Sequence, residues 1–155
     1  MSIIYKQIDA VIEEAIIKQY GNWVRECNCI VRGEGCYHIA AIDGDTVAGF
    51  AALHPEPWIS PLEQYGDGFI EVIEVQEGYR RRGIASTMVK MLEDFAASYG
   101  YRQIRAWSDT DAVEALHMWV KLRYCMCPAV MLGQSVHAEH QDQQILGYYY
   151  AKMLN

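Results

Sequence analysis

The order of apolar and polar residues predicts a strand, a turn and a long helix in the middle of the chain. Residues 69–75, FIEVIEV, are rich in Ile and Val, as in a strand that is covered on both faces. After a glycine-containing turn, apolar residues recur at steps of three or four and predict one continuous helical stripe: Ile84, Met88, Leu92, Phe95 and Tyr99. Gly100 is a typical helix stop.

Residues 102–108 predict a further strand after this helix. A strand, a helix and a strand in this order form a crossover between parallel strands, which is almost always right-handed. The middle of the chain is therefore expected to form a parallel strand–helix–strand unit.

The N-terminal part predicts a strand followed by helices. Residues 2–8 alternate weakly and indicate a first strand. Asp9 can cap the helix that follows, because its carboxylate can accept a hydrogen bond from a free backbone N–H group. Residues 23–29 indicate a second, short helix.

A hairpin and a long loop are expected next. The apolar segments 37–42 and 46–53 are joined by Asp43-Gly44-Asp45, and Gly44 can supply the positive φ of a tight turn. Residues 54–68 contain three of the four prolines and predict a loop, which is a candidate binding loop. Its Trp58 and Tyr65 stand among carboxylates and would suit a cationic amine. A solvated connection packed down by Trp58 is the other interpretation, and both remain open.

The C-terminal part predicts a helix and two last strands. Asp109 or Thr110 can cap the helix, and Asp111 with Glu114 resembles a capping box. The inner stripe of this helix is expected to contain Val113, Leu116 and Val120. The last strands are expected at 125–132 and 143–154, with a polar connection between them. The pattern as a whole predicts an α/β (α+β) fold, with helices on a mixed sheet.

Composition and charge restrict the classes of function. With 155 residues, of which 52% are hydrophobic, the chain suits one domain over residues 1–155. The net charge of −7 argues against nonspecific nucleic-acid binding. No apolar run approaches the roughly 20 residues of a membrane span, and the N-terminus lacks the features of a signal peptide. We therefore expect a cytoplasmic protein with no nucleic-acid or membrane partner.

The five cysteines are expected to be free thiols, because their number is odd and the compartment is reducing. A zinc site made of Cys27, Cys29, Cys36 and His38 is conceivable. The two C-x-C pairs do not have the C-x-x-C spacing of common zinc modules, so we expect no metal.

Three arginines and a glycine precede the central helix and predict an anion site. Arg80, Arg81 and Arg82 bring positive charge, and Gly83 allows a ligand to approach the backbone closely. The N-terminus of a helix offers free N–H groups and the positive end of the helix dipole. The physical expectation is a phosphate-binding turn.

The segment from Arg80 to Ala85, RRRGIA, fits the pattern Arg/Gln-x-x-Gly-x-Gly/Ala, and it follows a strand and precedes a helix. In this respect the chain resembles the GNAT superfamily of acyl-CoA-dependent N-acyltransferases. The resemblance implies a mostly antiparallel central sheet flanked by helices, with the parallel strand–helix–strand unit at the CoA site. It also implies an N-acetyltransferase that uses acetyl-CoA as cosubstrate.

The resemblance implies where acetyl-CoA binds. The pyrophosphate is expected in the turn, at Arg80, Arg81, Arg82, Gly83, Ile84, Ala85 and Ser86, mainly on backbone N–H groups. The pantetheine arm is expected to pair with the main chain near Ile73 and Val75. The acceptor would be a small-molecule or protein amine, and a homodimer is possible by the habit of the family.

Glu71 and Glu74 are the candidate general bases, because an amine with a pKa of about 10.4 must lose a proton before it attacks. Their odd spacing would place them on opposite faces of a regular strand, although a bulge could change this. The resemblance favours Glu71, whose position matches the glutamate common in the family.

The general acid is the weakest part of the resemblance. Trp119 stands where the family usually has a tyrosine, and an indole N–H cannot give up its proton. Tyr124, His117 and Cys125 are possible substitutes that the sequence does not rank. A catalytically weak CoA-binding or regulatory module is therefore the alternative function.

Overall fold

The structure is a computed structural model that describes residues 2–58, 60–62, 66–132 and 144–154. The described residues form a seven-stranded sheet in the order β1-β2-β3-β4-β5-β7-β6. The strands are β1 (Ile4–Gln7), β2 (Tyr37–Asp43), β3 (Thr46–Pro57), β4 (Gly66–Val75), β5 (Gln103–Asp109), β6 (Cys125–Leu132) and β7 (Gln144–Met153). Neighbouring strands are antiparallel except β4 and β5, so the predicted mixed fold is confirmed.

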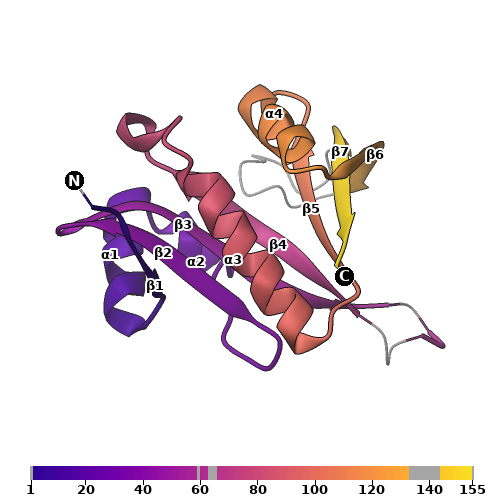
Figure 1. Ribbon diagram of the computed structural model, residues 1–155, viewed down its shortest axis with the longest axis horizontal. Helices are drawn as coiled ribbons and strands as arrows, with labels where there is room; N and C mark the ends of the chain where they lie inside the picture. The colour runs from indigo at the N-terminus through magenta and orange to yellow at the C-terminus, as the bar shows by residue number, and fades with distance from the viewer. Residues whose placement is uncertain (1, 59, 63–65, 133–143, 155) are drawn as a thin grey trace.

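The helices cover both faces of the sheet (Figure 1). Residues of α1 (Ala10–Tyr20) and α2 (Trp23–Glu26) pack on one face, around Phe50 and Val72. Residues of α3 (Ile84–Tyr99) and α4 (Val113–Lys121) pack on the other face, which we call the α3 face. A short 3-10 helix, η1 (Glu77–Tyr79), connects β4 to residues 80–83, which we call the basic turn. No described helix combines the length and apolar composition needed to cross a membrane.

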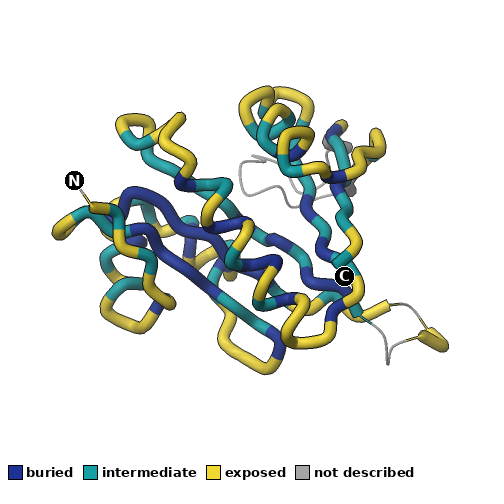
Figure 2. The backbone as a smooth tube through the Cα atoms, in the orientation of Figure 1, coloured by how far each residue is buried: buried dark blue, intermediate teal, exposed yellow. Residues whose placement is uncertain are grey.

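The long helix α3 is buried along the predicted face from Ile84 to Leu92, but the prediction is wrong at Tyr99 in the last turn. Ile84, Met88 and Leu92 are buried, whereas Tyr99 is 43% exposed. The small Ala96 is buried at the last turn, because the helix lies close to the sheet there. Figure 2 shows this buried stripe against the buried middle strands.

The parallel strands β4 and β5 pair over only a short length. The paired residues are Gly68 with Ile104, Phe69 with Arg105, and Ile70 with Ala106. Both strands continue beyond the last pair, β4 to Val75 and β5 to Asp109, and they separate there. The carboxyl ends of the two strands therefore leave a gap in the sheet.

A β-bulge lies at Glu71. Ala52 of β3 pairs with Val72, and Leu53 pairs with Ile70, so Glu71 is an extra residue on β4. Ile70 packs on the α3 face, and Val72 packs on the face of α1 and α2. The alternation of faces along β4 is therefore shifted by one residue at Glu71.

The predicted loop at residues 54–68 is partly wrong. β3 runs to Pro57 and pairs with β4 as far as Gly66, so residues 54–57 and 66–68 are strand. Prolines fit here because β2 pairs with β3 no further than Leu53, which leaves one edge of β3 free. Pro55 and Pro57 can turn their missing N–H positions toward that free edge without losing a ladder bond.

The predicted inner face of α4 is confirmed at Leu116, which packs against the core, and wrong at Val113 and Val120. Val113 and Val120 are 53% and 58% exposed, whereas Trp119 is 2% exposed. The Trp119 ring stacks on the ring of Tyr150 at a centroid distance of 5.4 Å. The helix has apolar residues on several sides, so this contact of large rings decides which side is buried. The predicted cap is absent, because Ala112 precedes the helix without a side-chain hydrogen bond.

Candidate active site

A cavity of about 720 Å³ lies between the carboxyl end of β4, the basic turn and α4. It is lined by the last residues of β4 and by residues from Asp111 on, just after β5, but by no residue of β5 itself. Its lining includes all but one of the residues predicted to bind the cofactor: Ile73, Val75, Arg80, Arg81, Gly83, Ile84, Ala85 and Ser86. From α4 and the turn before it come Asp111, Ala112, Val113, Glu114, Ala115, His117, Met118 and Lys121.

The basic turn has the backbone geometry of an anion site. Arg81 and Gly83 both adopt left-handed conformations, with φ values of 64° and 79°. Alternation of right- and left-handed residues turns successive N–H groups toward one point and forms an anion-binding nest. Gly83 caps α3 without a side-chain bond, and a Cβ atom added to it would meet nothing within 4 Å. The residues present therefore leave room for a pyrophosphate at the helix N-terminus.

The three arginine side chains go to different partners. Arg80 donates from Nε to the carbonyl oxygen of Val75 at 3.1 Å. The Arg82 guanidinium lies over the Tyr79 ring, 5.2 Å from its centroid, and Arg82 does not line the cavity. Arg80 and Arg81 also approach the Glu114 carboxylate, at 3.6 and 4.0 Å. Sequence reasoning missed both the left-handed Arg81 and this acidic neighbour from α4.

The two candidate bases lie on the same face of the sheet because of the bulge. Glu74 pairs with Phe50, and the bulge at Glu71 precedes Val72. Phe50 and Val72 are both buried on the face of α1 and α2. Burial is the main cause that raises the pKa of the nearby Cys29 thiol, and the charges of Glu71 and Glu74 raise it further. Burial raises the pKa of Glu71, and the negative charge of Glu56 raises it further. A raised pKa makes a carboxylate a better general base near neutral pH.

A network of charged residues lies next to Glu71. The Arg105 guanidinium pairs with the Glu56 carboxylate at 2.8 Å and with the Asp67 carboxylate at 2.7 Å. Gln103 donates to Asp67 at 2.7 Å, and Asp67 is 1% exposed. Asp67 is therefore a structural partner of Arg105, and not a loop residue as predicted. Nothing in the sequence pattern indicates that Arg105 lies here, because the pairing of β4 with β5 brings it in.

The residues considered for the general acid are placed in very different surroundings. Trp119 is buried in the core. The Tyr124 hydroxyl donates to the buried Glu93 carboxylate at 3.0 Å, and burial raises its pKa far above the usual range. His117 lines the cavity. Cys125 is exposed on β6 and borders a different hollow. Of these residues, only His117 borders the candidate site.

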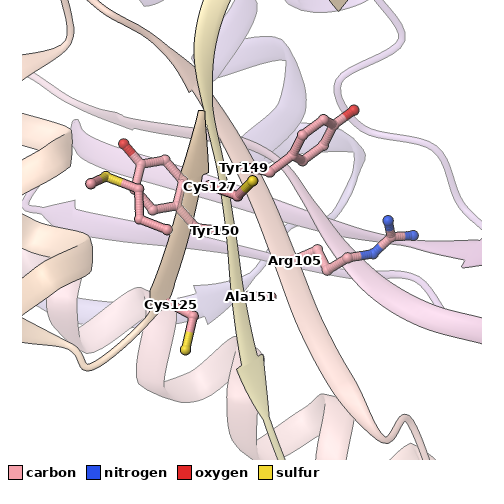
Figure 3. A pocket seen from close by; sticks show the side chains of 7 residues that line it. Arg105, Cys125, Cys127, Tyr149, Tyr150 and Ala151 are labelled. Carbon is pink, nitrogen blue, oxygen red and sulfur yellow. The ribbon is translucent and has the colours of Figure 1, made fainter. Parts of the chain in front are cut away.

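The hollow beside Cys125 is a separate, mainly apolar depression of about 210 Å³. Figure 3 shows Cys125, Cys127, Tyr149 and Arg105 around it, on β5, β6 and β7. In the same view the ring of Tyr149 extends away from β7 on the side opposite to the ring of Tyr150. The two neighbouring tyrosines thus belong to opposite faces of the sheet.

Of the two aromatic residues predicted for the acceptor, Trp58 does not line the cavity. Trp58 follows β3 and is 38% exposed. Trp58 follows the end of β3 that pairs with the start of β4, whereas the basic turn comes after the other end of β4. Tyr65 lies outside the described residues.

The five cysteines are free. Among the described residues, no group of three or more His, Cys, Asp or Glu side chains is arranged to hold a metal ion.

Comparisons with known proteins agree with this architecture. The sequence matches the acetyltransferase (GNAT) family over residues 6–124. It is 31% identical over 103 residues to a streptothricin acetyltransferase of Streptomyces lavendulae, which covers 63% of this chain and 50% of that protein. The chain thus spans about half the length of this relative.

Solved structures share the fold at low identity. The YncA putative acetyltransferase of Salmonella typhimurium, with acetyl-CoA, has a TM-score of 0.74 and 13% identity over 100% of this chain and 95% of that one. NAA60 of Arabidopsis thaliana, with acetyl-CoA, has a TM-score of 0.72 and 15% identity over 99% of both chains. Together with the match over residues 6–124, the fold and the basic turn establish that this chain belongs to the GNAT acetyltransferase family.

Proposed function

We propose that this protein is an N-acetyltransferase that transfers the acetyl group of acetyl-CoA to a primary amine. The observation that carries the proposal is the cavity at the separated ends of β4 and β5, with a left-handed basic turn at the N-terminus of α3. The turn offers backbone N–H groups and arginine charge to a pyrophosphate. The main chain of Ile73 and Val75 borders the same cavity, where a pantetheine arm would lie.

Glu71 is the general base of the proposed mechanism. An amine with a pKa of about 10.4 is protonated at neutral pH, so the base must take a proton before the nitrogen attacks the thioester carbonyl. Burial and Glu56 raise the pKa of Glu71 and thereby increase its basicity. Glu74 pairs with Phe50 on the face of α1 and α2 and lines the cavity, which Glu71 does not, so it is the second candidate.

The acceptor is proposed to be cationic when it arrives. Glu56, Glu71 and Glu74 bring negative charge to the region of the base, and Arg105 neutralises part of it. The relative from Streptomyces lavendulae is named a streptothricin acetyltransferase, which supports a small-molecule acceptor. A protein amine remains the other acceptor class of the proposal.

A catalytically weak CoA-binding module is the second candidate function. It is favoured by one observation, which is that the buried Trp119 occupies the position of the family's tyrosine. A CoA-binding module would bind acetyl-CoA without turning it over.

The two functions are distinguished by thiol release from acetyl-CoA in the presence of a panel of small amines and N-terminal peptides. Release that requires both the protein and an amine supports the enzyme, and acetylated product seen by mass spectrometry identifies the acceptor. Stabilisation of the protein by CoA, without release in any mixture, would favour the binding module instead.

A further inference from the structure

Ser108 of β5 and Ile73 of β4 stand at the same level on the two sides of the gap. The last parallel pair joins Ile70 to Ala106. Beyond it, Ser108 is two residues further along β5. Ile73 is three residues further along β4, but the bulge at Glu71 adds one residue without adding a step in the ladder. Ser108 and Ile73 therefore lie opposite each other, two ladder steps beyond the last pair, on the two sides of the gap between β4 and β5.

The Ser108 side chain is on the α3 face of the sheet. Ala106 and Tyr150 pair across β5 and β7, and both are buried in the core under α3 and α4. Ser108 follows Ala106 at the same side of the strand, because side chains alternate along a strand. Ile73 packs on this core as well. Ser108 is only partly buried, and it lies beyond the lining of the 720 Å³ cavity. The acyl end of a ligand that extends from this cavity into the gap would reach its hydroxyl.

The hydroxyl of Tyr150 holds the hydroxyl of Ser108. The two oxygen atoms are 2.9 Å apart and share a hydrogen bond. The Tyr150 ring is 0% exposed and is fixed by stacking on Trp119. A tyrosine hydroxyl that donates to the serine oxygen leaves the serine proton free to be donated elsewhere.

We propose that the Ser108 hydroxyl, oriented by Tyr150, donates a hydrogen bond to the leaving sulfur during acetyl transfer. The proposal rests on the proposed function, since it assigns a residue to the same site. Ser108 would be a catalytic residue that touches the reacting sulfur, and Tyr150 a positioning residue that acts through Ser108. The buried Trp119, in place of the family's tyrosine, would contribute by fixing the Tyr150 ring.

The step balances without any further reactant. The amine nitrogen forms a bond to the acetyl carbon, and the carbon–sulfur bond breaks with its electron pair going to sulfur. The base takes one proton from the ammonium before attack, and the second proton passes from the nitrogen to water as the amide forms. The sulfur leaves as a thiolate that accepts the Ser108 hydrogen bond. Burial raises the pKa of Tyr150, so its hydroxyl remains protonated and able to donate across the neutral range. The developing charge on sulfur is therefore met by a preorganised donor.

The direct test is the pKa of the CoA thiol when CoA is bound to the protein, measured from the ultraviolet absorbance of the thiolate as a function of pH. The variants are Ser108→Ala and Tyr150→Phe. The matched control is Tyr149→Phe, because Tyr149 is the next residue on β7 and its ring lies on the other face (Figure 3). The melting temperature of each variant is recorded to confirm that it folds. If Tyr150→Phe does not fold, the smaller change Ser108→Ala tests the proposal by itself.

The proposal expects a bound thiol whose pKa is lower than in free CoA, and expects Ser108→Ala and Tyr150→Phe to raise it. It also expects both variants to lower kcat about 10- to 100-fold, as for loss of a donor to a charged group, with an unchanged Kd for CoA. Tyr149→Phe should change neither quantity. A thiol pKa that both variants leave unchanged would overturn the proposal. This titration needs no acceptor, so it tests the role of Ser108 even if no amine is acetylated. Failure of the protein to bind CoA would overturn both the Ser108 proposal and the proposed function.

Discussion

The carboxylates of Glu71 and Glu74 lie on the same face of the sheet, although their spacing on a regular strand would separate them. The cause is the bulge at Glu71, which shifts the alternation of β4 between Ile70 and Val72. Glu74 also lines the cavity, whereas Glu71 lies outside its lining, next to the last residue of β4 that pairs with β5. Negative charge is thereby concentrated where the proposed acceptor must lose a proton.

Replacing the base tests which of these carboxylates acts. Glu71→Gln is expected to lower kcat about 10²- to 10⁴-fold, the usual contribution of acid–base catalysis, with little change in the binding of acetyl-CoA. Glu74→Gln is the matched variant, because it removes a carboxylate from the same face. Equal activity of wild type and Glu71→Gln would remove Glu71 from the mechanism, and a large loss only in Glu74→Gln would transfer the role.

Removing the negative charge of Glu56 is expected to shift the acidic limb of the pH–activity profile. Burial and Glu56 raise the pKa of Glu71, and the base acts only when it is deprotonated, so activity falls as the pH falls through this raised pKa. Glu56→Gln removes the neighbouring charge and should lower the pKa of Glu71, which shifts the acidic limb toward lower pH. The measurement is kcat/KM against pH for both proteins. A shift toward higher pH, or no shift, would contradict this coupling.

Gly83 is expected to be essential for cofactor binding. Gly83→Glu places a bulky anionic side chain at a left-handed position beside the phosphate site, and calorimetry with CoA should detect no binding. Gly78→Glu is the control, since Gly78 is also an exposed glycine with open space around its Cβ position but has no left-handed φ. Unchanged CoA affinity in Gly83→Glu would exclude the basic turn as the pyrophosphate site.

Glu114 is expected to oppose the cofactor. Its carboxylate lies 3.6 Å from Arg80 and 4.0 Å from Arg81, where it competes with phosphate for both guanidinium groups. Exposed pairs of this kind contribute only about 0–1 kcal/mol, so Glu114→Gln should tighten CoA binding by at most about fivefold. The effect should diminish at high salt. Weaker binding in Glu114→Gln would show that the carboxylate helps to orient the arginines.

Tyr124 is expected to stabilise the fold without taking part in catalysis. Its hydroxyl donates to Glu93, which also accepts from the Lys152 ammonium at 3.0 Å. Tyr124→Phe should lower the free energy of unfolding by about 1–3 kcal/mol, the contribution of a hydrogen bond to a charged group, and leave kcat unchanged. Tyr99→Phe, at an exposed ring, is the control for denaturant unfolding. A large loss of kcat in Tyr124→Phe would return this tyrosine to the list of general acids.

The sequence predicts most of the fold because its local signals agree with the tertiary structure. Asp9 accepts a hydrogen bond from the Ile12 N–H group at 2.8 Å, as expected of a helix cap. Gly44 and Gly100 adopt the positive φ values that their turn and helix end require, 61° and 102°. The basic turn could also be predicted, since charge, glycine and helix start are neighbours in sequence.

The parts that could not be predicted depend on packing between distant segments. The bulge at Glu71 exists only in relation to Ala52 and Leu53 of β3, and no residue type signals it. The buried side of α4 is decided by the stack of Trp119 on Tyr150. Arg105 reaches Glu56 only because β5 lies beside β4. Periodicity within one segment contains none of this information.

The central claim is that the basic turn and the gap between β4 and β5 bind acetyl-CoA for transfer to an amine. The most direct measurement is amine-dependent thiol release from acetyl-CoA, compared between the wild-type protein and Gly83→Glu across the same amine panel. We predict release by the wild type that depends on the amine, and none by Gly83→Glu. Equal release by the two proteins, or no release by the wild type with any amine, would contradict the claim.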